Sequence, residues 1–114
     1  MNMADPRTRA GCCTARVAGI DDTALERDVR VASALANETR YELLRSLVAA
    51  DGEVCACEFV GRVDASQSTV SRGLSALYDA GLASRRKEGQ WRYYAPTEAA
   101  ERLLETFDAI REER

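Results

Sequence analysis

The hydrophobic pattern of this chain changes near residue 82, and that change restricts the folds it can adopt. Before this point, apolar residues recur at the spacing of amphipathic helices in several short segments. The segment 82–95, LASRRKEGQWRYYA, is instead rich in aromatic and basic residues and is interrupted by Glu88-Gly89. This composition predicts a β-hairpin with a charged tip. Helical spacing then returns after Pro96 and Thr97, so the chain is expected to be mainly helical with one hairpin.

Residues that commonly start and stop helices divide the remaining chain. The expected helix starts are Asp21 or Asp22, Asn37, Ser66 and Thr97, and the glycines expected to follow helices are Gly52 and Gly81. A short additional helix is expected over residues 55–63. The order helix, helix, short helix, helix, hairpin, helix describes a winged helix-turn-helix domain over residues 21–114. Residues 1–20 show no hydrophobic period, and we expect them to form a mobile arm that carries Cys12 and Cys13.

The chain has no histidine and four cysteines. Without imidazole it can form neither Ser-His-Asp nor Cys-His catalytic sites, nor a zinc site that uses histidine. Cysteine is then the remaining soft metal ligand and strong nucleophile. No apolar run is long enough to span a bilayer, and residues 1–22 lack the apolar centre of a signal peptide. We therefore expect a cytoplasmic protein without membrane contact, in which the thiols are reduced.

The net charge of −3 is unevenly distributed along the sequence. Residues 62–94 contain six basic and three acidic side chains and carry +3, which leaves −6 on the rest of the chain. A local basic segment matters more for DNA binding than the total charge.

The helix expected after Ser66 has an apolar stripe opposite a row of small polar residues and one arginine. That row consists of Gln67, Ser68, Ser71, Arg72 and Ser75. Such residues can read base edges in the major groove, although an ordinary solvated helix face would look the same. The hairpin supplies the cations that phosphate contacts need, namely Arg85, Arg86, Lys87 and Arg92. These cations favour DNA as the partner.

Several segments of the chain together resemble the ArsR/SmtB family of metal-responsive repressors. They are LANETRYELLRSL (35–47), EVCACEF (53–59), SQSTVSRGLSALYDAGL (66–82) and RRKEGQWRYYA (85–95), within a similarity that covers about residues 24–108. EVCACEF is similar to the cysteine-containing metal box of the family's arsenic sensors. The resemblance implies a homodimeric winged-helix repressor that leaves its operator when metal binds. It also implies that Gln67, Ser68, Thr69, Ser71 and Arg72 face DNA.

One position departs from the family pattern. Gly73 stands where relatives often carry a bulkier polar residue. We expect that the lack of a side chain at this position removes a DNA contact. The first and last helices carry the apolar stripes that we expect to form the dimer interface.

Two cysteines lie in the short helix expected over residues 55–63. Cys55 and Cys57 would point about 200° apart in a regular helix, because each residue turns the helix by about 100°. Both can therefore face one ion only if the first turn is distorted; otherwise one of them is the main ligand. Adjacent Cys12 and Cys13, by contrast, can both turn toward one soft centre in a loop.

The resemblance implies how these cysteines combine, because some arsenic sensors of the family pair an N-terminal Cys-Cys with one helix cysteine of the other subunit. The preferred site is therefore a three-sulfur site of Cys12, Cys13 and Cys55, which suits As(III) or Sb(III) as the inducer. The resemblance favours Cys55 of the partner subunit, and the sequence leaves open a site within one chain. Cys57 could be a buried apolar residue, replace Cys55, or complete a four-sulfur site for Cd(II), Pb(II) or Zn(II).

Other functions remain open at this point. The same fold could sense thiol oxidation instead of metal, or the chain could be a metal-thiolate structural or buffering protein without an operator. An enzyme is not expected, because no cysteine begins the C-x₅-R pattern of a thiol-dependent arsenate reductase, and no permanent cofactor is expected.

Overall fold

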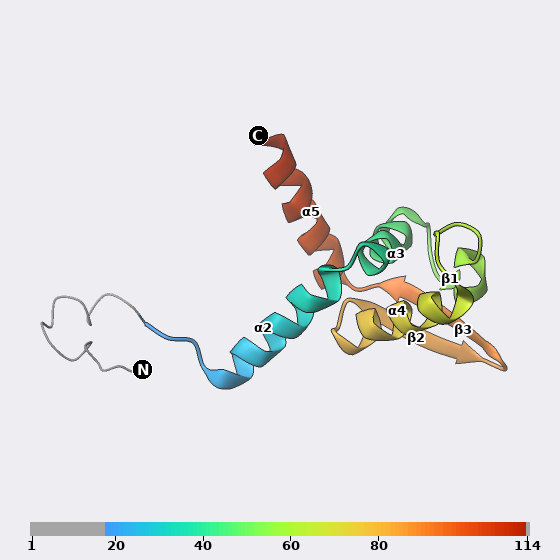
Figure 1. Ribbon diagram of the computed structural model, residues 1–114, viewed down its shortest axis with the longest axis horizontal. Coiled ribbons are helices and arrows are strands. Elements are labelled where there is room, and N and C mark those ends of the chain that lie inside the picture. Colours follow the sequence, from blue (N-terminus) through green and yellow to red (C-terminus); the bar gives the residue numbers. More distant parts are fainter. Residues whose placement is uncertain (1–17, 114) are drawn as a thin grey trace, which may run out of the picture.

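The computed structural model describes residues 18–113, and the predicted winged helix-turn-helix is confirmed in that range. The elements are α2 (Asp22–Leu35), α3 (Glu38–Ala49), β1 (Val54–Cys55), the 3-10 helix η1 (Ala56–Phe59), α4 (Gln67–Asp79), β2 (Ala83–Glu88), β3 (Trp91–Pro96) and α5 (Glu98–Glu112). Figure 1 shows α2 and α5 extending away from a body formed by α3, α4 and the strands. Within residues 18–113, no helix is long and apolar enough to cross a bilayer. The predicted arm lies outside the described residues except for its last three positions.

The residues predicted to start the helices do cap them. The capping side chains are Asp21, Asn37, Ser66 and Thr97, which accept backbone N–H groups of Ala24, Arg40, Thr69 and Ala100 at 3.1, 2.9, 3.2 and 3.2 Å. Each cap satisfies a donor that the helix leaves unpaired, which is worth about 1 kcal/mol. Local sequence therefore sets where each helix begins.

The core forms where α3 and α4 pack against each other and against the sheet. Its fully or almost fully buried side chains are Leu43, Leu44 and Leu47 of α3, Val70, Leu74 and Leu77 of α4, Tyr94 of β3 and Leu104 of α5. Burying one such side chain stabilises the fold by about 1.5–3 kcal/mol. This packing holds α4 in place and leaves its opposite side exposed.

The three strands form one antiparallel sheet in the order β1-β3-β2. Strands β2 and β3 are the predicted hairpin, which is the wing of the fold. Glu88 pairs with Trp91, so the turn consists of Gly89 and Gln90, one residue later than the predicted tip. Gly89 has φ of +62°, a conformation that glycine adopts without steric cost.

The prediction of a helix over residues 55–63 is wrong. Val54 and Cys55 instead form β1, which pairs with Tyr94 and Tyr93 of β3, and only residues 56–59 form a 3-10 helix. Pairing with the wing supplies backbone hydrogen bonds that the local pattern could not reveal. The Glu58 carboxylate also accepts the Cys55 N–H at 2.9 Å, which favours the tight turn over a regular helix.

The expectation for Gly73 is also wrong. Gly73 is buried on the side of α4 that faces α3, so a side chain here would not reach DNA. A Cβ atom at this position would lie 2.8 Å from Cδ1 of Leu43 and 3.5 Å from Cγ of Arg40. The glycine therefore permits the close approach of α3 and α4.

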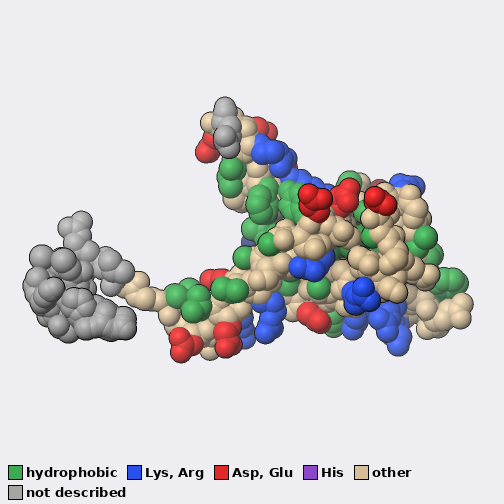
Figure 2. All heavy atoms as spheres, viewed as in Figure 1, with side chains coloured by type: hydrophobic (Ala, Val, Ile, Leu, Met, Phe, Trp, Pro, Cys, Tyr) green, Lys and Arg blue, Asp and Glu red, His purple; other side chains and the backbone are tan. Residues whose placement is uncertain are grey.

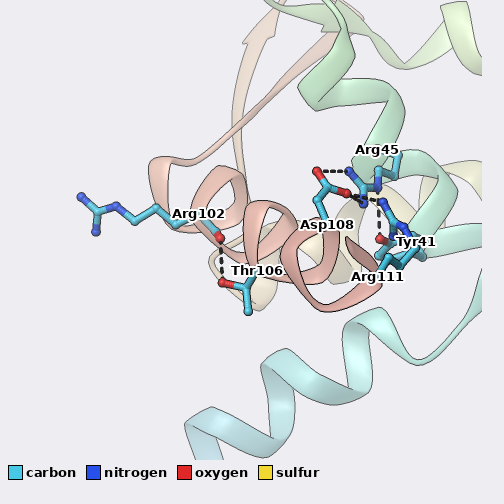
Figure 3. A network of polar contacts seen from close by, with 6 residues as sticks. All are labelled: Tyr41, Arg45, Arg102, Thr106, Asp108 and Arg111. Carbon is cyan, nitrogen blue, oxygen red and sulfur yellow. Dashed lines mark hydrogen bonds and ion pairs between the residues drawn. The ribbon is translucent and has the colours of Figure 1, made fainter. Parts of the chain in front are cut away.

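A polar network attaches α5 to α3 (Figure 3). The Asp108 carboxylate accepts hydrogen bonds from Arg45 at 2.6 Å and from Arg111 on its own helix. Arg45 also donates to the Tyr41 hydroxyl at 3.0 Å, and the Tyr41 ring meets the edge of Phe107 with 5.6 Å between centroids. The hydrogen bond from Arg45 is the main reason that the pKa of Asp108 is lowered.

We predict that Gly73→Ala lowers the free energy of unfolding. Alanine gains about 1 kcal/mol of helix propensity over glycine, but overpacking against the fully buried Leu43 costs about 1–3 kcal/mol. Urea unfolding measures the difference, and Ser71→Ala on the exposed side of α4 is the control without the steric contact. A gain of about 1 kcal/mol in Gly73→Ala would instead show that the Leu43 side chain can move aside without cost.

The ion pair of Asp108 predicts a pH-dependent contribution to stability. Because the folded pKa of Asp108 is lowered, its stabilisation is present above the ordinary carboxyl pKa and is lost as pH falls through the folded value. Asp108→Asn should therefore melt at a lower temperature than wild type at pH 7, with the gap closing below about pH 4. A gap that stays constant from pH 7 to pH 3 would contradict this role of the Asp108 charge.

Candidate nucleic-acid interface and thiol site

The exposed side of α4 carries most of the residues predicted to read DNA. Gln67, Ser68, Ser71 and Arg72 line one hollow of about 400 Å³ on this helix. Thr69 differs, because it is half-buried and its hydroxyl accepts a hydrogen bond from Ser66 at 3.0 Å. The structure therefore brings four of the five predicted residues together and places the fifth in the helix cap.

Two of the four wing cations face each other across the hairpin. Lys87 of β2 lies directly opposite Arg92 of β3. Neither forms an ion pair with another residue in the described range 18–113. Like charges in opposed positions destabilise a strand pair, so this pair forms a concentrated positive charge that an anion would neutralise.

The other two wing cations are engaged by the protein itself. The guanidinium of Arg85 lies 4.0 Å from the ring centroid of Tyr78 on α4. Arg86 forms ion pairs with Glu53 and Glu88, each at 2.8 Å. These contacts raise the pKa of Arg86, and its hydrogen bonds lower the pKa of Glu53.

The two cysteines of the described range lie next to each other. Cys55 ends β1 and is buried, whereas Cys57 lies in η1 and is exposed. Their Sγ atoms are 2.8 Å apart, because the change from strand to 3-10 helix turns both toward the same side. The pKa of Cys57 is raised mainly by the hydrogen bond from its thiol to Cys55, and to a smaller extent by desolvation. The predicted partners Cys12 and Cys13 lie outside the described residues.

One pocket brings the thiols and the proposed DNA-contacting residues together. It has a volume of about 260 Å³ and is lined by Cys55, Ala56, Cys57, Gln67, Val70, Ser71, Gln90, Trp91 and Arg92. Gln90 and Trp91 were not predicted as site residues, although the exposed tryptophan beside the hairpin turn was a signal that could have found them. Within residues 18–113, no three cysteine, aspartate or glutamate side chains converge to hold a metal ion.

The sequence is similar to regulatory proteins along most of its length. Residues 37–85 match the family described as bacterial regulatory protein, arsR family. The chain is 54% identical over 99 residues to the ArsR2 protein of Halobacterium salinarum, and this match covers 87% of this chain and 83% of that protein. The chain belongs to the ArsR family. This ArsR-family protein is also 50% identical over 88 residues to a second H. salinarum protein, ArsR, covering 77% of this chain and 68% of that one.

A solved structure agrees with the fold of this ArsR-family protein. The homodimeric winged helix-turn-helix DNA-binding domain from Mycobacterium bovis is 31% identical to it and superposes with a TM-score of 0.71. The match covers 86% of this chain and 93% of that domain. The architecture is therefore that of a transcriptional regulator of this family.

We predict that Lys87→Glu stabilises this ArsR-family protein in the absence of a ligand. The substitution replaces a repulsive pair with an attractive one opposite Arg92, which should raise the free energy of unfolding by about 0.2–1 kcal/mol. Lys87→Gln removes only the repulsion and is the control with the smaller gain. Urea unfolding at low and high salt checks the origin of the effect, because screening should reduce the difference. Equal stability of the two variants would contradict it.

Proposed function

We propose that this ArsR-family protein is a homodimeric repressor of an arsenical resistance operon, released from operator DNA when its thiols bind As(III) or Sb(III). The observation that carries the proposal is the pocket that Cys55 and Cys57 share with Gln67, Ser71 and Arg92. An inducer in this pocket would touch both helix α4 and the wing, which are the two elements that we expect to contact DNA. The two Halobacterium salinarum relatives, both named for arsenical resistance operons, support the choice of operon. A repressor acts at the chromosome, which places the protein in the cytoplasm.

The proposed DNA contacts follow from exposure and charge. Helix α4 would enter the major groove, where Arg72 and Gln67 can each form two hydrogen bonds to the edge of one base. Ser68 and Ser71 lie beside them on the same hollow and can donate to bases or phosphates. The opposed pair Lys87 and Arg92 would contact phosphates along the neighbouring backbone, which relieves their mutual repulsion.

The proposed dimer interface combines α2 and α5. Both helices extend from the body and carry exposed hydrophobic side chains, which gather over them in Figure 2. These residues are Leu25 and Val29 of α2 and Phe107 and Ile110 of α5, with 46, 52, 37 and 52% of their surface exposed. A second copy of the chain would bury this apolar surface, and the homodimeric M. bovis domain supports that arrangement. A two-fold dimer would match a palindromic operator.

The proposed inducer site is built around the pair of adjacent thiols. As(III) keeps a lone pair and binds three thiolates in a pyramid, so two neighbouring sulfur atoms and one further thiol fit it. We propose Cys55 and Cys57 as two ligands, since their sulfur atoms are 2.8 Å apart, with Cys12 or Cys13 as the third. The alternative set is Cys12, Cys13 and Cys55. Each As–S bond forms as a thiol S–H and an As–OH group of As(OH)₃ leave together as water, so binding releases no net proton. The raised pKa of Cys57 keeps its thiol protonated near neutral pH, and its ligation should therefore add no pH dependence to inducer affinity in that range.

The proposed release is a coupling between two ligands that use one region of the protein. Inducer bound to Cys55 would act on the wing directly, because β1 belongs to the same sheet as β2 and β3. A coupling of about 2 kcal/mol would weaken operator binding by about 30-fold. By linkage, operator DNA must weaken inducer binding by the same factor.

The test measures binding to DNA upstream of the protein's own gene, with and without arsenite, under reducing conditions. We predict that Cys55→Ser and Cys57→Ser keep operator affinity but lose release by arsenite, because each removes one sulfur of the adjacent pair. The Cys12→Ser and Cys13→Ser variants should each leave the operator only at higher arsenite concentrations than wild type. The variant with both changes should stay bound to the operator.

Other outcomes identify the alternatives. A Cys57→Ser variant that responds like wild type assigns the site to Cys12, Cys13 and Cys55. Release by Cd(II), Pb(II) or Zn(II) and not by arsenite indicates a four-thiolate site. Release by peroxide in metal-free buffer, reversed by a reductant, indicates sensing of thiol oxidation. No salt-dependent binding to the upstream DNA would exclude a repressor altogether.

A further inference from the structure

Among the four wing cations, Arg86 is the one whose side chain donates hydrogen bonds to other residues in the described range 18–113. Its Nε and Nη2 atoms donate to the two carboxylate oxygens of Glu53 at 3.0 and 2.8 Å, and its Nη1 atom donates to Glu88 at 2.8 Å. The guanidinium also stacks over the ring of Tyr93, 4.7 Å from the centroid. Three nitrogen atoms and one face of this group are therefore already engaged.

These contacts join the cysteine segment to the wing. Glu53 immediately precedes β1, whose second residue is Cys55. Tyr93 is the residue of β3 that pairs with Cys55 in the sheet. Arg86 on β2 therefore contacts both the residue that leads into the cysteine strand and the residue paired with the cysteine.

The network is strong enough to hold an orientation, although it is exposed. Isolated surface ion pairs contribute little to stability, but bidentate pairs and networks of several charges are the exceptions. Here a two-pronged contact to Glu53, a second carboxylate and a stacked ring act on one guanidinium. The two carboxylates would also repel a phosphate approaching Arg86, whereas Lys87 and Arg92 have no acidic partner in the described range 18–113.

We infer that Arg86 is a positioning residue that transmits inducer binding from the cysteine segment to the wing, and is not a phosphate contact. Its bond to Glu53 fixes the wing relative to β1 in the DNA-binding form. A change in the position of β1 when Cys55 and Cys57 bind the inducer would then move β2 together with Glu53. This inference rests on the proposed function, and it replaces the direct DNA contact that the sequence predicted for Arg86.

The experiment compares Arg86→Gln and Glu53→Gln with Lys87→Gln as the control, because Lys87 lies on the same wing but not among the residues that line the thiol pocket. Operator affinity is measured over a range of salt concentrations, with and without arsenite. Arsenite affinity in the absence of DNA is followed by the fluorescence of Trp91, the only tryptophan of the chain, which lines the thiol pocket.

We predict that Arg86→Gln and Glu53→Gln lower the arsenite-induced loss of operator affinity from about 30-fold to less than about 5-fold. Their salt dependence without arsenite and their affinity for arsenite should match those of wild type. Lys87→Gln should lower the salt slope by about two, one for each copy in the dimer, and keep the full response to arsenite. The exchange Glu53→Arg with Arg86→Glu should restore part of the response, which a general loss of stability would not allow.

Two results would overturn the inference alone. One is a normal arsenite response in Arg86→Gln together with a salt slope lowered by about two, one for each copy in the dimer, which would make Arg86 a phosphate contact. The other is a loss of response in Arg86→Gln that Glu53→Gln does not share. Wild type that binds the operator but is not released by arsenite would instead overturn the proposed function, and this inference with it.

Discussion

The pairing of β1 with β3 is the constraint on which the functional part of this protein depends. Two residues, Val54 and Cys55, pair with Tyr94 and Tyr93 and so extend the sheet of the wing. The chain then turns tightly into η1, and this turn brings Cys57 back to Cys55. One short strand thus makes the thiol pair and places it in the same sheet as the wing.

A second constraint is the close packing of α3 and α4. Gly73 leaves no side chain between the two helices, so the buried leucines of α3 can reach the apolar stripe of α4. The polar side of α4 is then held outward beside the wing, and the thiol pocket forms between α4, η1 and the start of β3. The pocket therefore depends on the same packing that exposes the helix to DNA.

Much of the fold could be predicted because its signals are local. A side chain such as Asn37 or Thr97 caps the helix that follows it directly, and the hairpin differs in composition from its neighbours. The errors at residues 55–63 and at Gly73 have a common cause, since each position takes its structure from a distant segment. Cys55 pairs with Tyr93, and Gly73 meets Leu43, neither of which lies nearby in the sequence.

The sequence by itself determined which functional groups this ArsR-family protein has. They are cysteine thiols without any histidine, a helix with one polar face, and a basic hairpin. Those are properties of residue types and of local spacing. Only the tertiary structure decided how they combine: that two sulfur atoms meet, that they share a pocket with Gln67 and Arg92, and that Arg86 binds Glu53. The physical reason is that strand pairing and side-chain ion pairs join residues more than 30 positions apart, which no local pattern encodes.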